Sequence, residues 1–247
     1  MARILGVIPA RLGSTRLQEK VLKPIHGRPM IEHVWRRAKQ AGKLSDVIVA
    51  CDDKRIEDCV RGFGGRAVMT DPAHPNGSSR VAEVAAKESA EFFINIQGDE
   101  PMINPENIDR LAEVFSDSSV RVATLAVRKT DIEEYENPNV VKVICDAKGN
   151  ALYFSRSPLP YFREKPKEGI SFLKHQGIYG YRREFLLDFV TWPAGKLENT
   201  EKLEQLRVLE RGIPIRVIEV ASDSWSVDTA EDLAAVEEKM KRLAEKN

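Results

Sequence analysis

The sequence predicts a three-layer α/β/α sandwich built around a mixed, mainly parallel central sheet. Short apolar runs rich in β-branched residues alternate along the chain with longer stretches whose apolar residues recur at helical spacing. Such alternation is typical of parallel strands connected by helices. Two apolar runs that flank residues 146–150 instead predict an antiparallel hairpin, and this hairpin makes the sheet mixed.

Composition narrows the class of protein. Lysine and arginine together number 38, as do aspartate and glutamate, so the formal net charge is +0 and gives no reason to expect nucleic acid or a membrane surface as partner. No segment has the pattern of a signal peptide or approaches the length of a membrane span. The 3 cysteines lack C-x-x-C spacing, and the 4 histidines lack zinc-ligand spacing. We therefore expect a cytoplasmic protein that forms a single domain over residues 1–247, without membrane insertion.

The elements follow from periodicity and from turn signals. We expect strands over residues 4–8, 47–50, 67–69, 92–97, 122–127, 140–145, 151–155, 175–181 and 214–220. We expect helices from residue 30 to about 41, over 54–62, after 79, after 104, over 198–211 and after 229. The predicted helix N-caps are Asp52 or Asp53, Ser79, Asn104 and Thr229. Three prolines between residues 156 and 169 predict an arm or lid rather than core.

The loop that follows the first strand is the first chemical landmark. The strand is expected to break at Pro9, and the small residues at positions 13–15 then leave room for a ligand near the backbone. Four cations lie along this loop: Arg11, Arg16, Lys20 and Lys23. Because ligands bind outside the carboxyl ends of strands in α/β sheets, the pattern favours a polyphosphate site. The alternative is an ordinary charged surface loop.

Two aspartates form the second landmark. Asp99 follows the strand predicted over residues 92–97, where a hard oxygen ligand would suit Mg²⁺, although a lone aspartate there is more often a turn former. Asp228 directly precedes Thr229, and Thr229 has capping-box spacing to Asp232, so Asp228 can face outward.

Several segments resemble, in the same order, the cytidylyltransferases that activate acidic eight- and nine-carbon sugars, and most closely the branch that uses 3-deoxy-manno-octulosonate (Kdo). They are IPARLGSTRL, GRPMI, IQGDEPMI, NPNVVKV, ALYFSRSPLP, HQGIYGY, LEQLRVLERG and VDTAEDL. The resemblance runs from residue 8 to about residue 233. It implies a fold like that of the nucleotide-diphospho-sugar transferases. It also implies the reaction of CTP with Kdo to give CMP-Kdo and pyrophosphate, for lipopolysaccharide biosynthesis.

The resemblance also implies residue roles. Asp99 and Asp228 would hold Mg²⁺, and Lys20 would stabilise the leaving pyrophosphate. The implied CTP-binding residues are Pro9, Ala10, Arg11, Thr15, Arg16, Lys20, Ser79, Arg80 and Gln97. The implied sugar-binding residues are Arg156, His175, Tyr179, Glu204 and Gln205. The hairpin and arm at about residues 140–175 would contribute to a homodimer interface.

Departures from the family pattern keep alternatives open. Gln18-Glu19 stands where Pro-Gly is typical before the lysine, and residues 223–226 replace a shorter turn. The substrate could be another acidic sugar, such as an 8-amino analogue of Kdo or a sialic acid, although the S-T-R-L loop argues against the sialate branch. A glycosyltransferase would be expected to carry a D-x-D-like motif. A non-catalytic nucleotide-binding protein would not need Asp99 and Asp228 together with Lys20.

Overall fold

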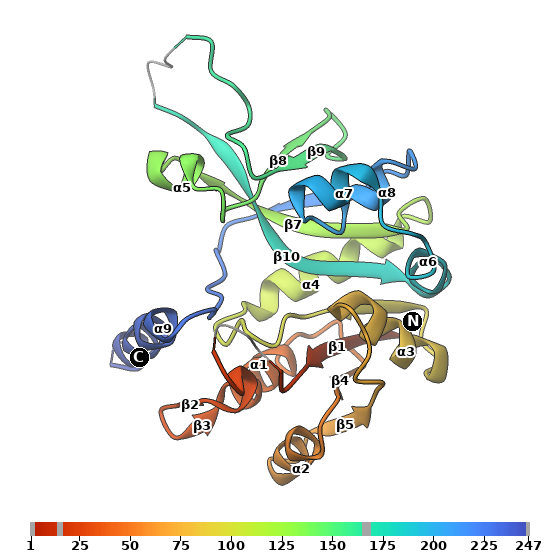
Figure 1. The fold of residues 1–247 in the computed structure, drawn as a ribbon, viewed down its shortest axis with the longest axis vertical. Coiled ribbons are helices and arrows are strands. Elements are labelled where there is room, and N and C mark those ends of the chain that lie inside the picture. Colours follow the sequence, from red (N-terminus) through yellow and green to blue (C-terminus); the bar gives the residue numbers. More distant parts are fainter. Residues whose placement is uncertain (1–2, 14–16, 165–168, 246–247) are drawn as a thin grey trace.

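The computed structural model describes residues 3–13, 17–164 and 169–245 (Figure 1). Its main strands are β1 (Ile4–Ala10), β4 (Asp46–Cys51), β5 (Arg66–Met69), β6 (Phe92–Asn95), β7 (Val122–Lys129), β8 (Lys142–Cys145), β9 (Ala151–Ser155), β10 (Phe172–Arg182) and β11 (Arg216–Val220). β2 (Pro24–Ile25) and β3 (Arg28–Pro29) form a separate small ribbon. The strand order in the main sheet is β11-β7-β10-β6-β1-β4-β5, and β8 and β9 attach to β10 as a hairpin.

The pairing confirms a mixed, mainly parallel sheet. β1 pairs in parallel with both β4 and β6, β4 with β5, and β7 with β11. β10 runs antiparallel to both of its neighbours, β6 and β7. The predicted hairpin is also confirmed, since β8 and β9 are antiparallel.

Helices cover both faces of the sheet. They are α1 (Met30–Ala38), α2 (Lys54–Gly62), α3 (Gly77–Lys87), α4 (Pro105–Glu113), α5 (Ile132–Glu136), α6 (Arg183–Phe189), α7 (Lys196–Glu201), α8 (Leu206–Leu209) and α9 (Ala230–Ala244), with short 3-10 turns at Lys20–Leu22 and Val114–Ser116. Side chains alternate along a strand, so Leu5 and Val7 join the core with α3 and α6, whereas Ile8 and Ala10 join the core with α1, α2 and α4. This division of the core confirms the three-layer arrangement.

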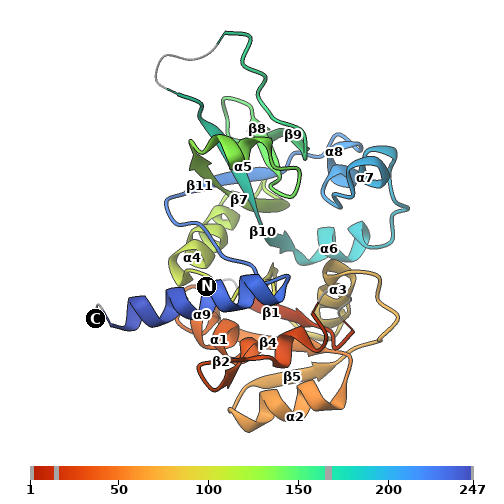
Figure 2. The same ribbon diagram turned by 60° about the vertical axis from the view of Figure 1, so that its left-hand side comes forward.

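α9 lies beside the β2–β3 ribbon and α1 (Figure 2). Val236 of α9 is buried with Ile25 and Met30 in a small separate core. His26 also contacts the helix, with its Nε2 2.8 Å from the carbonyl oxygen of Glu237. These contacts bring the segment just before α9 back to the loop that follows β1.

β1 continues two residues beyond its predicted end. Pro9 and Ala10 pair with Ala50 and Cys51 of β4, whereas the pairing with β6 stops at Val7. A proline without an N–H is tolerated where a strand has an unpaired side. The expected break at Pro9 was therefore wrong, and Pro9 and Ala10 belong to the strand end.

The predicted helix over residues 198–211 was also wrong. The structure has two short helices, α7 and α8, and Lys202 between them is left-handed with φ 54°. In one continuous helix Glu201 and Glu204 would lie on the same face. Instead Glu201 accepts a hydrogen bond from Ser155 (2.6 Å), and Glu204 accepts one from Ser78 of α3 (2.6 Å). The break allows these two carboxylates to bind different elements.

Three of the predicted helix caps are confirmed, at Asp53, Asn104 and Thr229. Ser79 was a wrong choice. The cap of α3 is Asn76, whose side chain accepts the N–H of Ser79 at 2.9 Å, so Ser79 lies in the first turn. The helix begins at Gly77, two residues before Ser79, and this earlier start makes Asn76 the cap.

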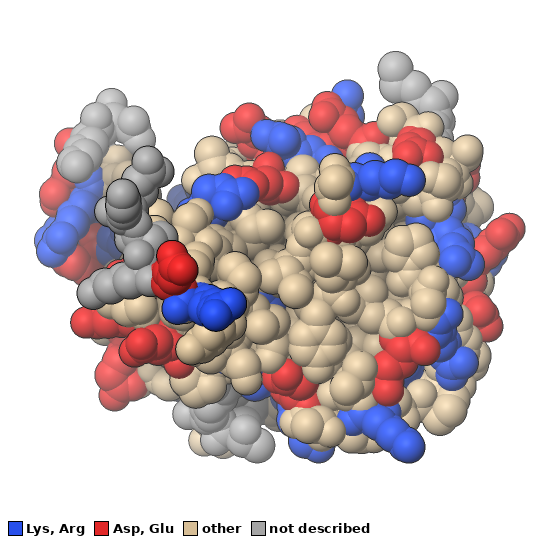
Figure 3. All heavy atoms as spheres, turned by 90° about the horizontal axis from the view of Figure 1, so that it is seen from above, with Lys and Arg blue, Asp and Glu red and all other residues tan. Residues whose placement is uncertain are grey.

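The described residues of the proline-rich arm project from the body of the molecule beyond β8 and β9 (Figure 1). Tyr161 in this arm is 84% exposed, and Leu152 on β9 is 60% exposed. On the face drawn in Figure 3, acidic and basic side chains are interspersed around an uncharged centre, which agrees with the net charge of +0. Within the described part of the chain, no helix combines the length and the apolar character needed to cross a membrane.

Lys142 holds the base of the arm from inside the protein. Its side chain is fully buried, and its ammonium group donates to the carbonyl oxygens of Asn137 (3.0 Å), Val140 (2.8 Å) and Arg156 (2.6 Å). Three acceptors match the three N–H groups of a lysine. Lys142 therefore joins the loop before β8 to the start of the arm.

We predict that Lys142→Met lowers the free energy of unfolding by about 2 kcal/mol or more, because a buried side chain loses its three hydrogen bonds to the carbonyl groups at the base of the arm. Urea unfolding followed by circular dichroism measures the change. Lys148→Met, at an exposed position in the β8–β9 turn, is the matched control and should change stability by less than about 0.5 kcal/mol. Equal stability of the two variants would contradict this role for Lys142.

Candidate active site

Two cavities adjoin at the carboxyl ends of β1 and β6. The first has a volume of about 350 Å³ and includes Pro9 and Ala10 from the end of β1. The second has a volume of about 450 Å³ and lies between β10 and the segment that joins α7 to α8. Gln97, just after β6, lines both cavities, and its amide donates to the carbonyl oxygen of Gly177 on β10 (2.8 Å). A molecule bound in one cavity can therefore meet a molecule bound in the other.

Most of the residues predicted to bind nucleotide line the first cavity. They are Pro9, Ala10, Arg11, Lys20, Arg80 and Gln97, and Asp99 and Asp228 line it with them. Ser79 is not in this wall, and its hydroxyl donates to the carbonyl oxygen of Asn76 (3.0 Å). Thr15 and Arg16 lie outside the described residues.

Close backbone packing brings the strand ends together. A Cβ added at Gly98 would stand 2.9 Å from the carbonyl oxygen of Pro9, so this approach requires glycine. On the other side, the N–H of Val227 donates to the carbonyl oxygen of Asp99 (2.9 Å). This bond places Asp228 next to Asp99, although the two residues are far apart in sequence.

The two aspartates converge on one cationic group. The ammonium nitrogen of Lys20 lies 2.7 Å from Oδ2 of Asp99 and 3.0 Å from Oδ1 of Asp228. Burial alone would lower the pKa of Lys20, but the charges and hydrogen bonds of Asp99 and Asp228 outweigh this effect and raise it above its usual value. Lys20 therefore stays protonated at neutral pH and marks a position where both carboxylates can bind a cation.

The unusual Gln18-Glu19 pair keeps the backbone conformation that glycine adopts easily. Glu19 is left-handed, with φ 52° and ψ 34°, directly before the 3-10 turn that begins at Lys20. Its carboxylate accepts a hydrogen bond from Arg55 of α2 (2.7 Å). Glu19 stands where the family pattern has glycine, and it adopts the conformation that glycine would adopt. This departure from the pattern is therefore compatible with the position of Lys20 between Asp99 and Asp228.

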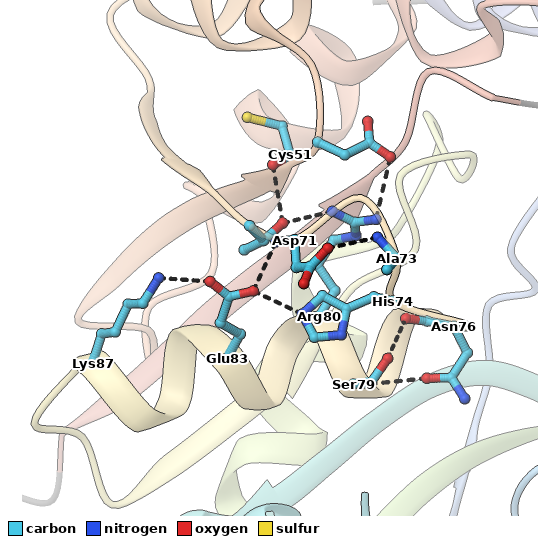
Figure 4. Close-up of polar contacts among 11 residues, drawn as sticks. Cys51, Asp71, Ala73, His74, Asn76, Ser79, Arg80, Glu83 and Lys87 are labelled. Carbon is cyan, nitrogen blue, oxygen red and sulfur yellow. Dashed lines mark hydrogen bonds and ion pairs between the residues drawn. The ribbon is translucent and has the colours of Figure 1, made fainter.

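Arg80 connects three segments around the first cavity (Figure 4). It is buried on α3 and donates to the hydroxyl of Thr70 (2.6 Å) and to Asp52 Oδ2 (3.2 Å). Asp52 also accepts the N–H of Leu12 (3.0 Å) in the loop after β1. The interpretation of Asp52 as a helix cap was wrong, because Asp53 alone caps α2 and Asp52 pairs with the buried guanidinium.

Sequence reasoning missed part of the wall of the first cavity. His74, Pro75, Asn76 and Gly77 also line it. Oε2 of Glu83, on α3, lies 2.7 Å from Nε2 of His74 (Figure 4). The same carboxylate accepts hydrogen bonds from the backbone N–H of Asp71 and from the ammonium group of Lys87. Burial would raise the pKa of Glu83, but these hydrogen bonds lower it to about 2. The available signal in the sequence was the Asn76-Gly77 pair, where the irregular loop enters α3.

Four of the five predicted sugar-binding residues line the second cavity, namely His175, Tyr179, Glu204 and Gln205. Arg156 is not among the lining residues. Its guanidinium donates to the carbonyl oxygens of Glu201 (2.8 Å) and Pro138 (3.0 Å) at the base of the arm.

His175 is neutral in this wall. Its Nε2 lies 2.9 Å from the hydroxyl oxygen of Thr124, and that hydroxyl has the carbonyl oxygen of Ile178 as an acceptor at 2.7 Å. A hydroxyl has one proton to donate, so Nε2 of His175 carries the hydrogen that Thr124 accepts. Burial lowers the pKa of His175 to about 3, which agrees with a neutral ring.

Glu204 joins the walls of the two cavities. Its carboxylate accepts from the amide of Asn76 (2.7 Å) and from the hydroxyl of Ser78 (2.6 Å), both at the start of α3. Burial raises the pKa of Glu204, although Ser78 and Arg207 oppose the shift. The same carboxylate thus binds the start of α3 and lines the second cavity.

Two carboxylates can hold a Mg²⁺ ion only with help from other ligands. Within the described ranges, no group of three or more His, Cys, Asp and Glu side chains is placed to hold a metal ion. Mg²⁺ commonly binds through one or two carboxylates and takes its remaining ligands from water and phosphate oxygens. The pair of Asp99 and Asp228, already arranged around a cation, fits this pattern.

Strand ends that gather a lysine and two carboxylates beside a polar cavity can bind a phosphate-bearing ligand together with a metal ion. Comparison with known families identifies the class of protein. A family model described as cytidylyltransferase matches residues 5–218. The chain belongs to the cytidylyltransferase family.

Individual relatives match over nearly their whole length. A 3-deoxy-manno-octulosonate cytidylyltransferase of Geobacter metallireducens is 48% identical over 251 residues, covering 98% of this chain and 99% of the relative. One from Myxococcus xanthus is 49% identical over 240 residues, covering 97% of each chain. The solved structure of a CMP:2-keto-3-deoxy-manno-octonic acid synthetase complexed with CTP has a TM-score of 0.93 and 44% identity, covering 98% of this chain and 99% of that one.

More distant structures share the fold alone. The 4-diphosphocytidyl-2C-methyl-D-erythritol synthase of Anaerococcus prevotii is 11% identical, with a TM-score of 0.65, over 97% of this chain and 99% of its own.

We predict that Gly98→Ala destabilises the protein by about 1–3 kcal/mol, because the new methyl group forces the ends of β1 and β6 apart. Gly62→Ala in α2 is the matched control, since an added Cβ there meets nothing within 4 Å. The control should be neutral or stabilising by up to about 1 kcal/mol. Thermal unfolding compares the two variants, and a neutral Gly98→Ala would contradict the close packing at this point.

Proposed function

We propose that the protein transfers the cytidylyl group of CTP to Kdo, giving CMP-Kdo and pyrophosphate. The observation that carries the proposal is the convergence of Asp99 and Asp228 on one cation position where two cavities adjoin. Family membership and the names of the relatives support this choice of nucleotide and sugar. The product would serve lipopolysaccharide biosynthesis in the cytoplasm.

In this mechanism the first cavity binds CTP. Arg11 and Lys20 would contact the triphosphate, Arg80 and Gln97 the nucleoside, and the backbone of Pro9 and Ala10 the strand-end side of the nucleotide. Lys20 would turn from the carboxylates to the phosphates when the substrates bind, and would stabilise charge on the departing pyrophosphate. The roles of Thr15, Arg16 and Ser79 in binding CTP remain predictions.

The second cavity would hold the sugar acid so that its anomeric 2-hydroxyl faces the α-phosphorus. The hydroxyl oxygen would form a bond to the α-phosphorus and release its proton to solvent. The bond from the α-phosphorus to the oxygen bridging the β-phosphorus would break, and pyrophosphate would depart in line with the incoming oxygen. Positioning of the two substrates supplies a large part of the rate acceleration in such a reaction. Asp99 and Asp228 would hold Mg²⁺, which supplies Lewis-acid stabilisation of charge and lowers the pKa of a bound hydroxyl.

Unpaired polar atoms support a polyhydroxylated ligand in the second cavity. Among the described residues that line it, four buried side-chain atoms have no hydrogen-bond partner: Glu100 Oε2, Gln176 Oε1, Gln205 Nε2 and Asp223 Oδ1. Buried polar atoms are nearly always paired in folded proteins. All four atoms are buried, so sugar hydroxyl groups, which both donate and accept hydrogen bonds, would pair with them once these side chains turn toward the cavity.

We predict that the purified protein releases pyrophosphate only when CTP, Kdo and Mg²⁺ are all present. Asp99→Asn and Asp228→Asn should each lower kcat/KM by about 100-fold or more, since each removes a charge from the cation position. Asp58→Asn, on the exposed side of α2, is the control and should retain full activity.

Release that persists in both aspartate variants would contradict the metal assignment and leave the substrate standing. Release with sialic acid or an 8-amino analogue, and none with Kdo, would redirect the substrate assignment to another acidic sugar. Absence of release with every sugar acid would favour a non-catalytic nucleotide-binding role.

We further propose that the protein is a homodimer that covers the exposed apolar side chains of the arm and β9. Tyr161→Asp should then shift the molar mass measured by light scattering from the dimer to the monomer. Met69→Asp, at an exposed apolar residue on the edge strand β5, is the control and should leave the dimer intact. A wild-type protein that is monomeric at micromolar concentration would contradict this proposal.

A further inference from the structure

Asp52 lies where β4 ends beside the loop that follows β1. It comes directly after Cys51, the last residue of β4, and Cys51 pairs with Ala10 at the end of β1. The two carboxylate oxygens of Asp52 have different partners. Oδ1 accepts the backbone N–H of Leu12 (3.0 Å), and Oδ2 accepts from the guanidinium of Arg80 (3.2 Å). One carboxylate therefore joins the loop after β1 to helix α3.

Arg80 fixes the orientation of this carboxylate. The residue is 3% exposed, and its guanidinium also donates to the hydroxyl of Thr70 (2.6 Å). That hydroxyl donates in turn to the carbonyl oxygen of Cys51 (2.9 Å). Turning the guanidinium away would leave a buried charge without its acceptors, which is costly. Asp52 therefore presents Oδ1 to Leu12 from a fixed position.

Arg11 is the functional side chain next to this contact. It is exposed and lines the first cavity, whereas Asp52 is not among the described residues that line it. The ladder between β1 and β4 ends at Ala10, and the N–H of Leu12 is held by Asp52. The backbone is thus held on both sides of Arg11. A cation whose position is already set loses less entropy when it binds a phosphate group.

The charges agree with an indirect role for Asp52. A carboxylate exposed in the cavity wall would repel a triphosphate. The side chain of Asp52 is only 13% exposed and pairs with Arg80, so the charges of the two side chains cancel. Asp52 can therefore support the loop through a hydrogen bond, while Arg11 presents its positive charge to the ligand.

We propose that Asp52 is a positioning residue for the nucleotide: it braces the loop after β1 against Arg80 and thereby holds Arg11 in place to bind the triphosphate. This inference rests on the proposed function, in which the first cavity binds CTP. Asp52 does not itself touch a substrate. Its contribution is to the affinity for CTP and leaves the binding of the sugar acid in the second cavity unaffected.

The test is Asp52→Asn, which keeps the shape of the side chain but leaves one acceptor oxygen for two donors. That oxygen will face Arg80, because a charge-assisted hydrogen bond is the stronger one, and the new NH₂ group will then oppose the N–H of Leu12. We expect the KM for CTP to rise about 5- to 20-fold, with kcat and the KM for Kdo changed by less than about 2-fold. Initial rates of pyrophosphate release measure all three constants.

The matched control is Asp53→Asn, which removes the same charge one residue further along the chain. The side chain of Asp53 accepts the N–H of Arg55 as the cap of α2, and asparagine is an equally good cap. This variant should leave kcat and both KM values unchanged. Melting temperatures report whether each variant is folded.

A double variant separates positioning from a general structural role. Arg11→Met should itself weaken the binding of CTP, measured by isothermal titration calorimetry. If Asp52 acts through Arg11, adding Asp52→Asn to Arg11→Met should weaken binding by no more than about 2-fold further. A structural role alone predicts that the full loss caused by Asp52→Asn appears again in the double variant.

An unchanged KM for CTP in Asp52→Asn would overturn this inference. So would an equal rise in Asp53→Asn, or additive losses in the double variant. These outcomes leave the cytidylyl transfer itself standing. Absence of pyrophosphate release from CTP and Kdo by the unsubstituted protein would overturn the proposed function and this inference with it.

Discussion

Two carboxylates held close together need a cation between them, and the architecture around the site depends on this requirement. Lys20 meets it in the present structure, and its ammonium group contacts Asp99 and Asp228 at hydrogen-bond distance. The three residues come from the loop after β1, the end of β6 and the segment before α9. Their convergence explains why the chain returns to the carboxyl edge of the sheet at its C-terminal end. The capping box of α9 fixes that return, since Asp232 accepts the N–H groups of both Asp228 (3.0 Å) and Thr229 (2.9 Å).

Two adjoining cavities lie at this edge of the sheet. Gly98 allows β6 to end against β1 beside the first cavity, whereas the antiparallel strand β10 passes beside Gln97 and lines the second cavity. Glu204 binds the start of α3 and faces that second cavity, which it can do because Lys202 breaks the helix before it. The order of the strands and one left-handed residue thus bring the proposed nucleotide and sugar sites together.

Much of this arrangement could be predicted from the sequence. The strands and most helices follow from apolar periodicity, and the caps at Asp53, Asn104 and Thr229 follow from local hydrogen-bonding chemistry. The grouping of Lys20, Asp99 and Asp228 came from the family resemblance. Local patterns could not reveal what long-range contacts decide: the ion pair of Asp52 with Arg80, the break at Lys202, and the unpaired oxygen of Gln176. Each of these depends on a neighbour that is distant in sequence.

A crystal structure of the protein with CTP and Mn²⁺, phased with anomalous data, tests the central claim most directly. The account predicts an anomalous peak between the carboxylates of Asp99 and Asp228, with the ammonium group of Lys20 displaced toward the phosphates. A peak bound elsewhere, with Lys20 still bridging the two aspartates, would contradict it.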